Sequence, residues 1–177
     1  SRLVGSEMCI RDSPMAGSEK SGMEHASVEL LKQATCIITP NECTDALALE
    51  KVTQFWSQLE MNPTHMSPED HDALIAKISH LPHIVASALA ASLSDIPDNQ
   101  FSFAGGGLND TTRVAGGSPR LWQSIIAENS DQILKSIDHF EQSLKALKSS
   151  LAEEDLDGLH KILQDGQLVR KTIEKSK

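Results

Sequence analysis

Aromatic side chains, basic charge and long apolar runs are scarce in this sequence of 177 residues. Phe, Trp and Tyr together make up 3% of it, and 25 acidic side chains against 16 basic ones give a net charge of −9. Nucleic acid and anionic membranes are bound by basic faces, and bases stack on aromatic platforms. No apolar run approaches the roughly 18 residues of a membrane helix. The composition therefore argues against nucleic acid or a membrane as the main partner.

Targeting and disulfide signals are also missing. Cys9, Cys36 and Cys43 are an odd number of cysteines without metal-ligand spacing, which favours three reduced thiols. The first residues lack the basic and then apolar layout of a signal peptide. We therefore expect a cytoplasmic protein.

Ala, Leu and charged helix formers dominate, which predicts a mainly α-helical fold. Periodicity predicts strands at 34–39 and 62–66, helices at 27–33, 45–60, 67–93, 119–151 and 155–175, and a loop at 99–108. Strand and helix alternate first and helices follow, so the last elements of an α/β domain should precede a helical domain. The helix over 119–151 carries a heptad-like stripe, which indicates a core or an oligomer seam: Trp122, Ile126, Asn129, Ile133, Ile137, Phe140, Leu144, Leu147 and Leu151.

Three segments follow from these patterns. Residues 1–13 show no period and resemble a translated adapter read-through, so we expect a non-native leader without regular structure. Residues 14–66 should be the remnant of an α/β domain. Residues 67–177 should form the helical domain.

The helix that starts at Ser67 contains the first candidate site. Ser79 and His83 are four residues apart, which places them on one face of a helix, and Pro82 should bend or loosen the turn between them. A lone buried histidine is usually a satisfied core residue, but two histidines, a serine and a proline in one apolar turn favour a site. No carboxylate is well placed to complete a metal site around His80 and His83, so we expect no metal.

A second candidate lies around Arg113, which follows the glycine run Ala104–Gly107 and a polar segment. Glycines let backbone approach a ligand closely, although most glycine loops only turn the chain. A guanidinium in this segment can grip a carboxylate through two parallel hydrogen bonds. A surface ion pair with Asp110 explains Arg113 equally well on pattern alone.

Together these pieces resemble the prephenate/arogenate dehydrogenases of tyrosine biosynthesis. The resemblance runs from Pro14 to about the end of the chain. It depends on the order and spacing of several motifs: Pro-Met-Ala-Gly-Ser-Glu-Lys-Ser-Gly at 14–22, Ile-Thr-Pro at 38–40, His71-Asp72, Ser-His-Leu-Pro-His at 79–83, Gly-Gly-Gly-Leu-Asn-Asp-Thr-Thr-Arg at 105–113, and Trp122.

The resemblance implies an oxidative decarboxylation of prephenate or arogenate, with hydride transfer to NAD or NADP. It implies a homodimer formed through the helical domain, with the substrate pocket near the dimer interface. By position the resemblance assigns substrate binding to Ser79, His83, Gly106, Gly107 and Arg113, of which Arg113 matches the carboxylate-binding arginine. It adds Asn109 and Asp110 as residues facing a neighbouring subunit's site, and Glu19 and Trp122 as supporting residues.

The sequence departs from the family pattern at the catalytic residue and at the cofactor-binding turn. The family's catalytic histidine position, directly before Pro14, is occupied here by Ser13, and serine without a partner is a poor general base. A glycine-rich strand–turn–helix for the cofactor pyrophosphate is also absent. We therefore expect the C-terminal part of such an enzyme, inactive alone and without a catalytic residue of its own; the alternative is a non-catalytic helical dimerisation module.

Overall fold

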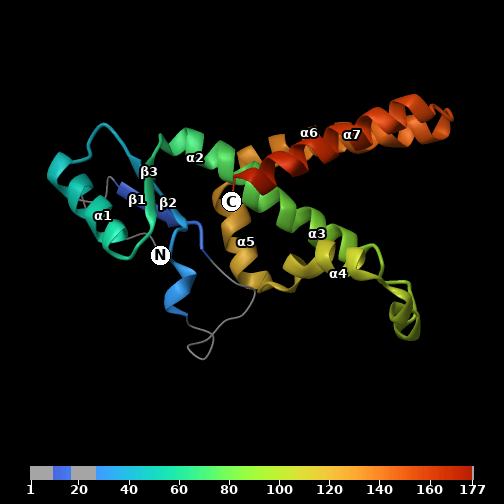
Figure 1. The fold of residues 1–177 in the computed structure, drawn as a ribbon, viewed down its shortest axis with the longest axis horizontal. Coiled ribbons are helices and arrows are strands. Elements are labelled where there is room, and N and C mark those ends of the chain that lie inside the picture. The colour runs from blue at the N-terminus through green and yellow to red at the C-terminus, as the bar shows by residue number, and fades with distance from the viewer. Residues whose placement is uncertain (1–9, 17–26, 177) are drawn as a thin grey trace. The chain divides into compact units, whose positions relative to one another are not determined.

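The computed structural model describes residues 10–16 and 27–176, so Glu19 lies outside the described residues. The chain divides into two compact units, Ser1–Ile133 and Leu134–Lys177. The first unit contains a small sheet and the helices up to α5, and the second contains most of α6 and all of α7 (Figure 1). The expectation of a mainly helical fold with a few α/β elements is confirmed.

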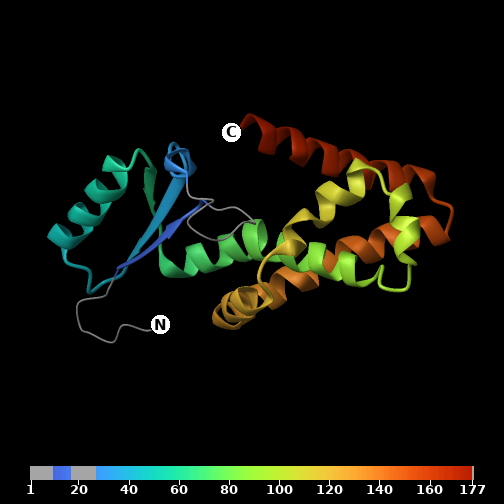
Figure 2. The ribbon, with the colours of Figure 1, turned by 90° about the horizontal axis from the view of Figure 1, so that it is seen from below.

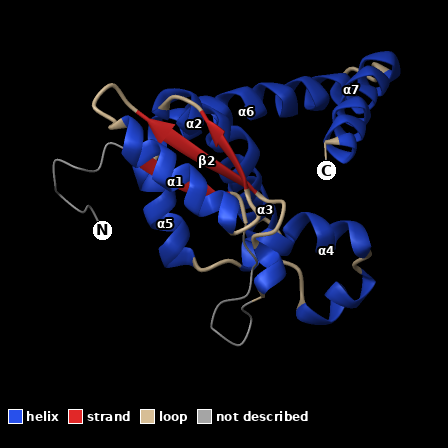
Figure 3. Ribbon diagram, turned by 60° about the vertical axis from the view of Figure 1, so that its left-hand side comes forward, coloured by secondary structure: helices blue, strands red, loops and turns tan. Residues whose placement is uncertain are grey.

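The sheet has three strands in the order β1-β2-β3. Strand β1 (Ile10–Pro14) runs antiparallel to β2 (Thr35–Pro40), and β3 (Asn62–His65) runs parallel to β2. Helix α1 (Ala46–Gln58) makes the crossover that a parallel pair requires. Helices α1 and α2 lie on opposite sides of the sheet (Figures 2 and 3). The predicted strands at 34–39 and 62–66 and the helix at 45–60 are confirmed within a few residues.

Burial explains why β2 forms the centre of the sheet. Its residues Cys36, Ile37, Ile38 and Thr39 are all buried, and Cys36 and Ile38 pack with Met61 in one core cluster. Partly buried Leu49, Val52 and Trp56 of α1 cover that cluster from one side. The strand is therefore held by apolar packing as well as by its ladders on both edges.

Strand β1 corrects one expectation about the N-terminal segment. Residues 10–13 belong to β1, where Ser13 is paired with Ile37, so the expected lack of regular structure is wrong for them. Backbone groups on the open edge of a buried strand need partners, and β1 supplies them for β2. Residues 1–9 lie outside the described residues. The expected helix at 27–33 is a single 3-10 turn, Val28–Leu30, because Gln33 takes a left-handed φ of 59° shortly after it.

The predicted helix from Ser67 is present but is not uniform. It consists of α2 (Pro68–Ile75), a π turn η3 (Ala76–His80) and α3 (Leu81–Ala91). The Ser67 hydroxyl caps α2 by accepting from the Asp70 amide at 3.0 Å. In the π turn the Leu81 amide donates to the Ala76 carbonyl, five residues back. Pro82 follows directly and has no amide proton, so the wider turn lies where regular helical bonding cannot continue.

Composition alone would allow this segment to cross a membrane. Pro68–Ala91 contains an 18-residue window of mean hydropathy 1.4, which differs from the expectation that no run approaches that length. The segment packs within the first unit, however: α2 contacts β2, and α3 contacts α4 and η5. It also buries two histidines, His80 and His83. A core helix of a folded domain has the same properties.

The region after α3 is more helical than expected. The 3-10 helix η4 (Asp98–Phe103) and α4 (Gly106–Thr112) occupy most of the predicted loop at 99–108, and η5 (Arg113–Gly116) continues from α4. The hydroxyls of Thr111 and Thr112 bond to carbonyls four residues earlier, which suits a helix. Both α4 and η5 pack against α3.

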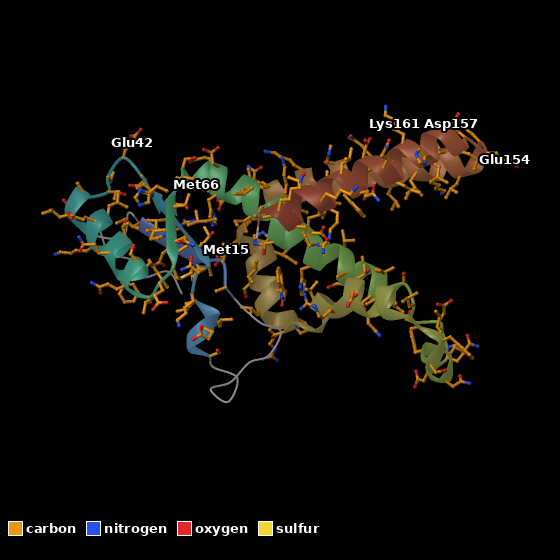
Figure 4. All side chains as sticks on the ribbon, viewed as in Figure 1. Met15, Glu42, Met66, Glu154, Asp157 and Lys161 are labelled. Carbon is orange, nitrogen blue, oxygen red and sulfur yellow. The ribbon has the colours of Figure 1, made fainter. Side chains whose placement is uncertain are left out.

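The predicted helix at 119–151 is broken at Asn129. Helix α5 (Pro119–Glu128) ends there, and α6 (Ser130–Ala152) begins on the next residue. Asn129 has φ −128° and ψ 30°, outside the helical region. In the second unit, α6 is joined by a short turn to α7 (Leu156–Lys175), and Glu154 has a left-handed φ of 56° in that turn. Figure 4 labels Glu154 and Asp157 at this turn.

Candidate functional site

A cavity of about 540 Å³ opens in the first unit between the sheet and the helices. Strand β1, the residues directly after it and Thr39 of β2 line one part, while α2, the π turn, the end of α5 and Asn129 line the rest. Figure 4 labels Met15, which lines the cavity where the chain leaves β1. Its polar lining side chains are Arg11, Asp12, Ser13, Thr39, His71, Asp72, Ser79, His80, Glu128 and Asn129.

An acid–histidine pair lies on α2 beside this cavity. His71 Nδ1 is 2.9 Å from the Asp72 Oδ1 carboxylate oxygen. The other ring nitrogen, Nε2, is buried, and among the buried side-chain nitrogen and oxygen atoms of the described residues it is the one without a hydrogen-bond partner. If Nδ1 carries the proton that Asp72 accepts, Nε2 of the neutral ring is an acceptor. The pair therefore offers a lone pair, held in orientation by a carboxylate.

His80, in the π turn, is the second histidine of the cavity. His80 is buried, with 9% of its surface exposed. Burial lowers the pKa of His80 below 6.5, neighbouring His71 lowers it further, and the Asp72 carboxylate partly opposes both effects. His80 is therefore neutral at pH 7. The Asn129 amide nitrogen lies 3.4 Å from its Nδ1 and donates to the Asp72 carbonyl at 2.8 Å.

His83 belongs to a neighbouring aromatic cluster. Its ring stacks on Trp122 with centroids 3.5 Å apart and planes 11° from parallel, and His80 meets the same indole edge-on at 6.2 Å. Gly117 packs against the two stacked rings, so closely that a Cβ at this position would lie 2.8 Å from Trp122 Nε1. Burial lowers the pKa of His83 as well. Trp122 of α5 thus contacts His80 of the π turn and His83 of α3.

The structure separates the residues that the sequence assigned to one pocket. Ser79 lines the cavity, whereas His83 is stacked on Trp122 and is not among the lining residues. Gly106 and Gly107 form the exposed start of α4, and Arg113 is exposed where α4 passes into η5. The possible cross-subunit residues, Asn109 and Asp110, are exposed on α4. Their roles remain predictions.

Sequence reasoning gave no site role to Asp72 or Asn129. The His71-Asp72 dipeptide was visible as a motif, but adjacent residues on a helix give no sign that their side chains pair. Asn129 was assigned to an apolar stripe, and its polarity in that stripe was the available signal. No cluster of three or more His, Cys, Asp or Glu side chains suited to a metal ion occurs in residues 10–16 and 27–176.

Two sequence models of protein families match the chain. One, described as "Prephenate dehydrogenase, dimerization domain", matches residues 67–165, and another, "Prephenate dehydrogenase, nucleotide-binding domain", matches residues 1–62. A cyclohexadienyl dehydrogenase from Zymomonas mobilis is 34% identical over 89% of this chain and 55% of its own length. A prephenate dehydrogenase from Bacillus subtilis is 36% identical over 82% of this chain and 40% of its own length.

A solved structure gives the same result. Prephenate dehydrogenase from Aquifex aeolicus, in complex with hydroxyphenyl propionate and NAD+, is 35% identical and superposes with a TM-score of 0.85. The match covers 93% of this chain and 58% of that one. The chain therefore spans about half the length of the curated relatives that it matches.

Proposed function

The chain belongs to the prephenate dehydrogenase family, and from that premise we propose that it carries the substrate-binding and dimerisation part of a prephenate or arogenate dehydrogenase. Such an enzyme moves a hydride from the ring carbon that bears the hydroxyl to NAD or NADP, releases carbon dioxide and makes the ring aromatic. The product belongs to tyrosine biosynthesis, and we infer a cytoplasmic location. The observation that carries the proposal is the polar cavity beside Ser13 in a chain of this family.

Nucleotide binding cannot be derived from the described residues. A dinucleotide pyrophosphate is held by a glycine-rich turn between a strand and a helix. The glycines of the described residues are Gly105, Gly106, Gly107, Gly116, Gly117, Gly158 and Gly166, all after the sheet. None of them can form that turn, so the described residues do not include the element that holds the pyrophosphate; the family uses NAD or NADP, and its nucleotide-binding model matches residues 1–62.

Ser13 determines the activity expected of this polypeptide. It lines the cavity from β1, at the position where the family resemblance places a histidine base. A serine hydroxyl cannot take up the substrate's proton near pH 7 without a base beside it. Its hydroxyl lies 4.0 Å from Met15 Sδ, which is not a base. The 177-residue chain should bind substrate without turning it over.

Activity measurements test this expectation directly. Mixed with prephenate and NAD+, the 177-residue chain should form no NADH. A chimera with the nucleotide-binding part of the Aquifex aeolicus relative placed before residue 14 should be active with histidine at residue 13 and should lose most activity with serine there. Turnover by the 177-residue chain alone would contradict the proposal.

Arg113 is proposed to hold a substrate carboxylate. Arg113 is an exposed residue at the junction of α4 and η5, where a bidentate contact would contribute about 1.5–3 kcal/mol, which is roughly 10- to 160-fold in affinity. Calorimetric titration with prephenate should show this loss in Arg113→Ala. Arg120→Ala, on the exposed first turn of α5, is the control and should bind as the parent does. Equal affinities of the two variants would remove Arg113 from the site.

The second unit supports the homodimer. Apolar side chains of α6 and α7 are more than half exposed in the single chain: Leu134, Leu144, Leu151, Leu156, Leu163, Leu168 and Val169. Many exposed apolar side chains on two helices support an interface between subunits, because large exposed apolar patches mark interaction sites. Sedimentation should give a dimer, and Leu163→Glu should give a monomer. A dimer that never binds prephenate would favour the alternative, a non-catalytic dimerisation module.

A further inference from the structure

Asn129 connects two parts of the cavity that are distant in sequence. It lies between α5 and α6, and its side chain reaches back 57 residues to the Asp72 carbonyl and 49 residues to His80. Both contacts are partly buried. They involve the same atom, the amide nitrogen Nδ2.

The Asp72 carbonyl determines which way the Asn129 amide is turned. A backbone carbonyl oxygen can only accept a hydrogen bond, so the Asn129 atom 2.8 Å from it must be the NH2 group. That group has two hydrogens. One points to the Asp72 carbonyl, which leaves the second for His80 Nδ1 at 3.4 Å.

This orientation has a consequence for the imidazole. An NH2 group has no acceptor to offer, so a proton on His80 Nδ1 would face a hydrogen of Asn129. The neutral ring must therefore carry its proton on Nε2. Protonation to the cation would also place a hydrogen on Nδ1, which Asn129 opposes; burial already lowers the pKa of His80 in the same direction.

We propose that Asn129 is a positioning residue that fixes the neutral, Nε2–H tautomer of His80, so that the cavity is offered an N–H donor and not a base. The oxygen of a substrate hydroxyl or carboxylate is the group that such a donor would bind. Binding of a substrate oxygen by this N–H group rests on the proposed function, whereas the assignment of the tautomer does not depend on it. Asn129 acts through His80 and is not a catalytic residue.

Other titratable and charged groups line the same cavity as His80. They are Arg11 and Asp12 on β1, His71 and Asp72 on α2, and Glu128 at the end of α5. The Asp72 Oδ1 oxygen is 2.9 Å from His71 Nδ1, and the Asp72 carboxylate raises the pKa of His80 against the larger effect of burial. The Asn129 amide is the hydrogen-bonding partner of His80 Nδ1 in the described part of the chain.

Nuclear magnetic resonance of the 177-residue chain with 15N-labelled histidine tests the tautomer without any assay of activity. Two-bond 15N–1H correlations distinguish Nδ1–H from Nε2–H rings. His80→Gln identifies the His80 signals among those of the seven histidines. At pH 7.5 the parent chain should show His80 in the Nε2–H form. An Nδ1–H ring, or an even mixture, would overturn the proposal before any variant is made.

Asn129→Asp is the decisive variant because it keeps the shape of the side chain and replaces the donor with an acceptor. It should convert His80 to the Nδ1–H form and move its titration midpoint upward. Asn62→Asp is the matched control: Asn62 Nδ2 also donates to a backbone carbonyl, that of Gln33 at 2.8 Å, and has no contact with a histidine ring among its hydrogen bonds. It should leave the His80 signals unchanged.

The outcomes separate the two proposals. If Asn129→Asp leaves both the tautomer and the midpoint of His80 as they are in the parent, Asn129 has only a structural role. If the tautomer changes as expected but the parent chain does not bind prephenate, the proposed function fails and the positioning role stands. Should Asn129→Asp not fold, Asn129→Ala takes its place: it removes the donor without adding a charge, and a His80 ring that keeps both its tautomer and its midpoint in that variant would overturn the positioning role.

Discussion

Two adjacent glycines provide a test of the packing around Trp122. Gly116 ends η5 and has no atom within 4 Å of the position where a Cβ would lie. At Gly117 the same Cβ would lie 2.8 Å from Trp122 Nε1 and 3.1 Å from His83 Cε1. Gly117 has φ −65°, which alanine adopts without strain, so only the contact with the two rings opposes the substitution.

The expected effects have opposite signs. Gly→Ala at a compatible backbone stabilises by about 0.4–1 kcal/mol, because the unfolded chain loses freedom. Extra atoms in a packed site cost about 1–3 kcal/mol. Gly116→Ala should therefore raise the free energy of unfolding, and Gly117→Ala should lower it by about 1 kcal/mol net. The difference of about 2 kcal/mol corresponds to roughly 4–8 °C in Tm.

Urea unfolding followed by tryptophan fluorescence and circular dichroism measures both variants. Trp122→Phe removes the indole nitrogen, so Gly117→Ala should cost less in that background than in the parent chain. If Gly117→Ala proved as stable as Gly116→Ala, the stack of His83 on Trp122 would not be packed against residue 117 as described.

Two further predictions concern pH and capping. Burial holds the pKa of His80 and His83 below 6.5, so the unfolded chain takes up protons that the folded chain refuses as the pH falls through 6.5. The contribution of the two neutral histidines to the free energy of unfolding should be complete above that pH and should decline below it. Urea midpoints between pH 7.5 and 5.5 measure the decline, which His80→Gln should reduce; a flat profile would contradict buried neutral rings. Ser67→Ala removes the hydroxyl that accepts from the Asp70 amide and should lower the unfolding free energy by about 1 kcal/mol. Thermal melting checks this effect, and an unchanged Tm would show that the cap contributes nothing.

The elements predicted from the sequence were those with a strong local signal. Residues Thr35–Pro40 are apolar and β-prone and end in a proline, and they form the buried central strand. Ser67 followed by Pro68 gave the start of α2. The break at Asn129 escaped prediction because Asn129 falls at a position of the apolar stripe, so the periodicity continues across it. A helix that stops and restarts without losing its spacing leaves no trace in that pattern.

The site was only partly predictable for a different reason. Placing Ser79 and His83 on one face assumed a regular helix of 3.6 residues per turn. The π turn at Ala76–His80 changes that spacing, and it is His80 that lines the cavity together with Ser79. The partner of His80 comes from residue 129, and single-sequence periodicity carries no information about contacts over such a separation.

The π turn also absorbs one residue of chain length. An α-helix advances about 100° and 1.5 Å per residue and closes its hydrogen bond over four residues, whereas the π turn closes over five. Five residues in the wider turn therefore span about the same arc as four residues of an α-helix. Removing one exposed residue such as Lys77 would allow a regular helix through the segment and would keep His80 and His83 on nearly the same faces relative to α2. A regular helix with all five residues would instead turn both histidines by roughly 100°, away from Asn129 and Trp122.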